Sequence, residues 1–191
     1  MFYEFSHRHT PCVVDGNEDV VILSRETKAT TVMGKEYVYN GVFSPESLIN
    51  RGSLVQTEDT FLVLSLRRTV DQDNYCSLVK TNAVVEVQRY QQAYDANDNP
   101  VGDAEFTSVA ADVVCFAQYV TAQLRQQEPG LLPSTAFILQ LQTTVDIKDP
   151  QDSSLSAPDR IVMGGKTYQV DVVDRIKSPN LLHVQLSEDR R

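Results

Sequence analysis

Tryptophan is absent from this chain of 191 residues, and histidine and cysteine each occur only three times. The lack of tryptophan weakens the case for a carbohydrate-binding module, because such modules rely on flat aromatic faces to hold sugars. The three cysteines, Cys12, Cys76 and Cys115, are odd in number and lack C-x-x-C spacing, so neither a disulfide framework nor a zinc site is indicated. We expect all three to be reduced and buried.

Basic residues are also in deficit, with 17 lysines and arginines against 26 acidic residues and a net charge of −9. This balance argues against a surface that grips phosphates, although an acidic channel wall could repel DNA and let it slide past. The longest apolar runs, FILQLQ and FLVLSL, are far shorter than the roughly 18 residues of a membrane span. The first residues also lack the apolar core of a signal peptide. We therefore expect a soluble protein made in the cytosol.

Short runs of Val, Ile, Leu, Tyr and Phe dominate the chain, and many of them alternate apolar with polar residues, which is typical of half-buried strands. The runs are residues 19–24, 35–43, 61–69, 82–90, 136–147, 160–163, 167–173 and 181–186. The predicted fold class is mainly β, with one small antiparallel β-barrel or two in tandem and one or two helices. In the fourth run, alternation places Val85, Val87 and Arg89 on one face.

Two segments have helical signals. Apolar residues recur at helical spacing in residues 108–128, and Pro129-Gly130 supplies a stop. The alternative for its first half is a strand with Val113, Cys115, Ala117 and Tyr119 on one face. A second, shorter helix is expected to begin at Ser44 as its N-cap and to run to about residue 50.

Polar segments predict three loops, at residues 26–35, 95–103 and 148–159. The second is expected to be a hairpin tip. The third is long and polar, with two prolines and three serines. A connection of this length without structure of its own is either dispensable or functional.

The chain also contains an internal similarity between residues 52–68 and residues 159–175. Each segment is a strand, a tight polar turn and a strand opened by Thr and an aromatic residue. Aligned without gaps, the pairs include Leu54 with Ile161, Thr60 with Thr167, Phe61 with Tyr168, and Val63 with Val170. Upstream, residues 20–25 resemble residues 84–89. Tandem duplication, with domains at 1–81 and 82–191, and chance similarity of apolar strands both remain open.

The second half of the chain resembles a known family. The segments NAVVEVQRY, DANDNPVGDAEF and APDRIVMGGKTYQVDVVDRIKSPNLLHVQLSED are similar to the head-closure (stopper) and head-to-tail joining proteins of tailed bacteriophages. Those proteins open with a strand ending in arginine and close with a glycine-containing hairpin. The corresponding hairpin residues here are Asp159, Arg160, Gly164, Gly165 and Tyr168. The two glycines permit the positive φ of a tight turn.

The resemblance implies a structural virion protein and not an enzyme, with no catalytic residue, cofactor or metal. It implies a homo-oligomeric ring of six or twelve copies in the viral neck, assembled in the host cytoplasm without a membrane. A portal or adaptor protein would lie above the ring, and a tail terminator or tail proteins below it. Packaged DNA would pass through the channel without sequence-specific binding. A tail terminator, a portal adaptor and a generic β binding module are the alternatives.

A channel-gating loop should be long, polar and free of strong DNA affinity, and the loop at 148–159 fits best. Its candidate gating residues are Lys148, Asp149, Gln151, Asp152, Ser153, Ser154 and Ser156. Residues 90–105 are the second choice. For either loop, an ordinary solvated connection is the alternative.

The histidines suggest no site of their own. His7 and His9 form an H-x-H pair, but no neighbouring carboxylate or cysteine completes a set of metal ligands. A frayed or interface-seeking terminus is the expected state of this segment. His183 alternates with apolar residues, so we expect its side chain at the surface.

Overall fold

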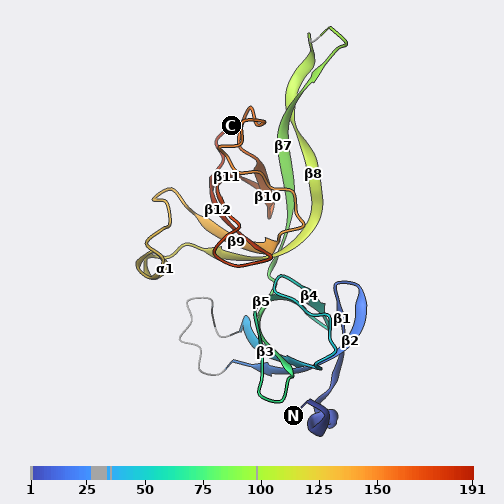
Figure 1. Cartoon of the computed structure of the whole chain (residues 1–191). Helices are drawn as coiled ribbons and strands as arrows, with labels where there is room; N and C mark the ends of the chain where they lie inside the picture. The colour runs from blue at the N-terminus through green and yellow to red at the C-terminus, as the bar shows by residue number, and fades with distance from the viewer. Residues whose placement is uncertain (1, 27–33, 35, 98) are drawn as a thin grey trace. The chain divides into compact units, whose positions relative to one another are not determined.

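The computed structural model describes residues 2–26, 34, 36–97 and 99–191 (Figure 1). The chain forms two compact units. The first comprises Met1–Asn82 with Ile176–Leu181, and the second comprises Ala83–Arg175 with Leu182–Arg191. Each unit contains a closed antiparallel β-barrel, so the predicted fold class is confirmed.

The first barrel has the strand order β1-β2-β3-β6-β5-β4 and is closed by pairing of β4 with β1. Its strands are β1 (Thr10–Val14), β2 (Asn17–Arg25), β3 (Val38–Phe43), β4 (Leu54–Gln56), β5 (Thr60–Arg68) and β6 (Asn74–Lys80). Its core contains fully buried apolar side chains from different strands, including Val21, Phe43, Val55 and Leu78. The barrel therefore encloses a packed interior.

The second barrel has the strand order β7-β8-β9-β12-β11-β10 and is closed by pairing of β10 with β7. Its strands are β7 (Ala83–Tyr94), β8 (Pro100–Tyr119), β9 (Phe137–Gln142), β10 (Arg160–Met163), β11 (Lys166–Asp174) and β12 (Leu181–Glu188). Numbered from its own first strand, this order is the same as that of the first barrel.

The two barrels also share a local irregularity. The β5–β6 pairing has a bulge between Val63 and Ser65, and the β11–β12 pairing has one between Val170 and Val172. The alignment without gaps pairs Val63 with Val170, so in the second strand of each hairpin the aligned residues occupy equivalent positions. Since Phe61 and Tyr168 pair with Val55 and Ile161 respectively, the first strands are offset by one residue from that alignment. The second hairpin is one residue longer.

The upstream part of the internal similarity is wrong. Residues 20–25 lie in β2, whereas residues 84–89 lie in β7, which is the counterpart of β1. The two segments are similar in composition because both are short and rich in valine, but they occupy different strand positions in their barrels.

The long helix expected at 108–128 is wrong, and the strand alternative for its first half is confirmed. Strand β8 continues to Tyr119, and only α1 (Ala122–Gln127) is helical. In β8, Cys115 is fully buried in the barrel core, and pairing with β7 and β9 uses the backbone hydrogen bonds that a helix would need. The side chain of Thr121 accepts a hydrogen bond from Leu124 N and begins α1.

The other local expectations have mixed outcomes. The helix at 44–50 is wrong, because Pro45 and Glu46 form a turn and no helix follows. Instead, a 3-10 helix η1 (Phe2–Arg8) precedes β1. The loop at 26–35 lies mostly outside the described residues. The hairpin tip expected at 95–103 is shorter than predicted, because β7 ends at Tyr94 and β8 already begins at Pro100. Across the part of the chain that the structure describes, no helix is long and apolar enough to span a membrane.

Candidate functional site

A buried ion pair lies at the base of the predicted gating loop. Arg89, on the core face of β7, donates two hydrogen bonds to the carboxylate of Asp159, from Nε to Oδ1 and from Nη2 to Oδ2, each 2.9 Å long. The Asp159 side chain is fully buried, and only 11% of the Arg89 side chain is exposed. Such a two-pronged pair fixes both position and orientation. Hydrogen bonding to Asp159 raises the pKa of Arg89 despite its partial burial.

The same arginine also holds the segment before the loop. Its Nη1 lies 2.8 Å from Oδ2 of Asp146, and Nη2 donates to the Asp146 carbonyl. The backbone N of Lys148 donates to Oδ2 of Asp159 over 2.9 Å, so the two ends of the loop meet at one carboxylate. Ile147, between them, is fully buried in the barrel core. The loop is therefore anchored at both ends by residues that connect directly to β7.

Between these anchors, the loop is folded as successive polar turns. The Asp149 carboxylate accepts a hydrogen bond from Gln151 N, and the Asp152 carboxylate accepts one from Ser154 N. Lys148 Nζ donates to Ser154 Oγ over 2.6 Å. Most of the candidate gating residues are exposed: Asp149, Gln151, Asp152, Ser153, Ser154 and Ser156. The arrangement presents a mostly polar surface between its fixed ends, in which Leu155 is partly buried.

The predicted hairpin residues lie along the β10–β11 hairpin, from Asp159 just before β10 to Tyr168 within β11. Gly164 and Gly165, with φ of +57° and +75°, form its turn, and Tyr168 packs in the barrel core. The sequence placed Asp159 where the chain leaves a polar loop, but its side chain is the buried partner of Arg89. Arg160 makes its contacts elsewhere, at the base of a long projection formed by β7 and β8.

That projection is the distal part of the β7–β8 hairpin, here called the arm and comprising residues 90–106. It continues beyond the rest of the second barrel (Figure 1). Strand β7 pairs with β10 only as far as Gln88, and β8 pairs with β9 only from Phe116. The arm strands therefore pair only with each other in this unit.

A cationic and aromatic cluster supports the root of the arm. The guanidinium carbon of Arg160 lies 3.6 Å from the centroid of the Phe106 ring, and Tyr90 packs against the same ring at 5.2 Å. Arg160 Nε donates to the buried carboxylate of Asp189, which also accepts from Arg191. Burial alone would raise the pKa of Asp189, but the hydrogen bonds from Arg191 and Arg160 lower it to about 2.

The outer face of β12 is covered, which corrects the expectation for His183. This side chain is only 9% exposed, and its Nε2 lies 3.8 Å from Glu128 Oε2. Gln185, two residues later on the same face, accepts hydrogen bonds from Leu132 N and Thr135 Oγ1. The segment that contains α1 therefore shields this face, and alternation could not reveal it because both faces of β12 are buried.

The N-terminal segment from Phe2 to His9 is not frayed. Phe2 is only 4% exposed, and its backbone N donates to Asp73. His9 stacks on the Phe2 ring and contacts the Phe2 carbonyl through Nε2. His9 thus helps to hold η1 against the first barrel. Within the described residues, no group of three or more His, Cys, Asp and Glu side chains is arranged to hold a metal ion.

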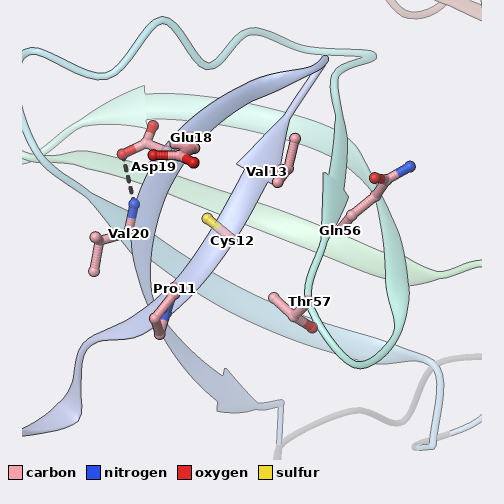
Figure 2. A pocket seen from close by; sticks show the side chains of 8 residues that line it. All are labelled: Pro11, Cys12, Val13, Glu18, Asp19, Val20, Gln56 and Thr57. Carbon is pink, nitrogen blue, oxygen red and sulfur yellow. Dashed lines mark hydrogen bonds between the residues drawn. The ribbon is translucent and has the colours of Figure 1, made fainter.

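Figure 2 shows a surface pocket in the first barrel, formed by β1, β2, the end of β4 and the turn after it. Its volume is about 620 Å³. Two carboxylates, Glu18 and Asp19, line it. Asp19 accepts hydrogen bonds from Val20 N and from the Ser47 hydroxyl. Burial, and secondarily Asp19, raises the pKa of the Cys12 thiol to about 12. A thiol in this state is a poor nucleophile at neutral pH, so Cys12 does not suggest catalysis here.

Burial similarly raises the pKa values of Cys76 and Cys115 to about 12. All three cysteines are free and buried, as expected.

Sequence reasoning missed Arg89 as an anchor, although the signal was present. Alternation had put Arg89 on the same face as Val85 and Val87, which are core residues. A charged side chain on a core face requires a partner. Asp159 is 70 residues away in the sequence, so spacing alone could not identify it. Comparison of the sequence with protein-family models and with curated proteins found no match.

Proposed function

We propose that this chain is a structural neck protein of a tailed bacteriophage. It forms a ring below the portal or adaptor, closes the channel to retain packaged DNA and offers a docking surface to the tail. The observation that carries the proposal is the loop at 148–159, which is exposed and polar along its middle and fixed at both ends by the Arg89–Asp159 pair.

The anchoring suits a channel closure. A gate must stay in place under pressure from DNA, and a buried two-pronged ion pair holds the ends of the loop to the barrel. The exposed middle, by contrast, makes few contacts that would have to break for it to move. When DNA passes, the polar turns in the middle of the loop do not have to be replaced by apolar contacts.

Charge supports the same relation to DNA. The second unit contains eight lysines and arginines and fifteen acidic residues. Such a surface would not hold phosphates tightly, which is suitable for a channel through which DNA must leave.

The tandem barrels bear on the number of copies. Six copies of this chain would present twelve barrels of one strand order, whereas twelve copies would present twenty-four. We favour the six-copy ring, because each chain supplies two barrels of the same strand order, so that six copies already provide twelve similar units. The tail terminator and the portal adaptor remain alternatives within the same neck, and a generic β binding module lies outside it.

Deletion of residues 149–157 tests the gate. Since Lys148 N lies 2.9 Å from the Asp159 carboxylate, the shortened connection can close without displacing the anchor. We expect particles that assemble the ring but lose packaged DNA before tail attachment, measured as nuclease-sensitive DNA. The matched control replaces the same nine positions with glycine and serine, which preserves length and should retain more DNA than the deletion. Full retention by the deletion variant would contradict the gate.

Electron microscopy of the protein with portal complexes and tail-less heads tests the position in the neck. A ring below the portal that closes the channel is the expected result. If the protein binds neither the portal, nor an adaptor, nor a tail end, the neck function is wrong and a free β binding module is favoured.

A further inference from the structure

The arm has the properties of a connector between molecules. The arm, residues 90–106, contains four acidic residues and no lysine or arginine. Near the tip, Tyr94 and Val101 are 63% and 53% exposed. A two-stranded ribbon is marginally stable alone in water, and its outer edges offer unpaired backbone groups. An acidic ribbon with exposed apolar side chains is thus suited to a partner surface.

The arm is also built to keep its shape. At the tip, the Asp95 carboxylate accepts hydrogen bonds from Asn97 N and Asn99 N, which lower its pKa. At the root, Phe106 is covered by Arg160, which the buried Asp189 carboxylate holds. A preformed projection loses less conformational entropy on docking than a loose loop would.

A complementary surface lies elsewhere on the same unit. A pocket of about 430 Å³ is lined by Tyr119, Arg125, Thr135 and Arg190, among others. Arg125 donates to the carbonyls of Leu132 and Thr135 over 2.8 and 2.6 Å, which fixes one wall. Tyr119 is 63% exposed, and Arg190 is exposed at the rim. The pocket thus combines an open aromatic face with two arginines and one carboxylate, Glu188, so positive charge exceeds negative charge there on an otherwise acidic unit.

The geometry of β8 separates the two surfaces. The strand runs from Pro100 near the arm tip to Tyr119 in the pocket, a contour of about 65 Å for a fully extended strand. Tip and pocket therefore belong to opposite ends of one strand. Two arms would repel each other, since both are acidic, so pairing of arm with arm is disfavoured. Arm to pocket is a head-to-tail contact, which generates a ring when the rotation closes.

We propose that the arm of one copy docks on the pocket formed by Tyr119, Arg125 and Arg190 of a second copy. The exposed Tyr94 would pack against Tyr119, and the acidic tip would lie next to Arg190. This inference rests on the proposed function and deepens it, because it names the contact that joins neighbours in the ring.

Two variants test the docking. The armless variant replaces residues 94–100 with Asn-Gly, and the pocket variant carries Arg190→Glu with Tyr119→Asp. Each alone should be monomeric by native mass spectrometry at concentrations where the wild type assembles. Their mixture should form a 1:1 heterodimer and stop there, because the armless chain still has a pocket and the other still has an arm. Lys166→Glu, the same charge reversal outside the pocket, should assemble like the wild type.

Three outcomes would overturn the docking: wild-type assemblies that survive in either variant, a mixture that stays monomeric, or a wild-type chain that is monomeric even at about 100 µM. The proposed function fails separately. Rings joined by the arm that do not bind portals or retain DNA would preserve the docking and contradict the neck. Rings that retain DNA but tolerate both variants would contradict the docking alone.

Discussion

The two barrels share a strand order and a bulge but differ in what their connections do. Val14 of β1 pairs with Val55, and Val87 of β7 pairs with Ile161, so these positions correspond. Two residues after Val14, the chain has already turned through Asp15 and Gly16, both with positive φ. Two residues after Val87, by contrast, β7 has not turned: it continues through Arg89 into the arm.

This difference shows where the second barrel is more elaborate than the first, although the two share one strand order. In the first barrel the strand ends in a tight turn, whereas in the second its extension carries both the loop anchor and the arm. Since Arg89 belongs to the extension, the anchored loop and the arm both depend on this one segment of β7. We expect changes to that segment to affect the second unit while the first remains stable.

The largest effect is expected for Arg89→Ala. The variant leaves the fully buried Asp159 carboxylate without its cation, which should destabilise the second unit by about 3–5 kcal/mol. Hydrogen exchange followed by mass spectrometry, read separately for each unit, measures the change. Arg68→Ala, at the exposed end of β5, is the control and should alter stability by about 0.5 kcal/mol or less.

A second variant separates charge from packing at this anchor. Arg89→Met combined with Asp159→Asn removes both charges while keeping side chains of similar length. It should recover part of the lost stability, because no uncompensated charge remains buried. If the double variant is as unstable as Arg89→Ala, packing and not charge dominates the anchor.

The sequence predicted the barrel scaffold better than its additions. Alternation identified β2, β3 and β5 of the first barrel and most of the second, since a half-buried strand has a period of two. It missed β1, where Pro11 interrupts the pattern, and β6, whose apolar residues do not alternate strictly with polar ones. It also misread β8, because residues 113–124 satisfied the spacing of a helix and of a strand at once, and only pairing with β7 and β9 decided between them.

The candidate site was predictable in part. Composition identified the polar loop at 148–159 and the glycine turn of the hairpin. The contacts that fix them are long-range: Arg89 with Asp159, and Arg160 with Asp189 and Phe106. Such contacts depend on strand register and on which faces are covered, neither of which a local pattern contains.

Acid should weaken the second unit through Asp189. Its pKa is lowered from 3.8 to about 2 in the folded chain, so its contribution is present above about pH 4 and is lost as the pH falls towards 2. The loss should reach about 2 kcal/mol. The measurement is the free energy of unfolding of the wild type and of Asp189→Asn between pH 5 and pH 2. The wild type should lose this stability as the pH falls, whereas the variant should not show the loss that comes from Asp189. Parallel pH profiles would exclude it.

Gly41→Ala should instead act on the first barrel. An added Cβ would lie 2.9 Å from both Cys76 Sγ and Leu78 Cδ1 in the packed interior. We expect a loss of about 1–2 kcal/mol in the first unit and none in the second, measured by the same exchange experiment. Leu78→Val should relieve part of the strain. Gly130→Ala is the control, since a Cβ there meets nothing within 4 Å; an equal loss would show that crowding is not the cause.

The smallest effect is expected at the hairpin turn, where the barrels again differ. The first closes its hairpin with Thr57 and Asp59, without glycine, whereas Gly164 adopts a φ of +57° with open space around it. Gly164→Ala should therefore cost about 1 kcal/mol from backbone strain alone. Gly164→Asn should cost less, because asparagine tolerates this region better than alanine does. Thermal unfolding of the two variants measures the order, and equal losses would mean that the turn tolerates side chains without distinguishing their backbone preferences.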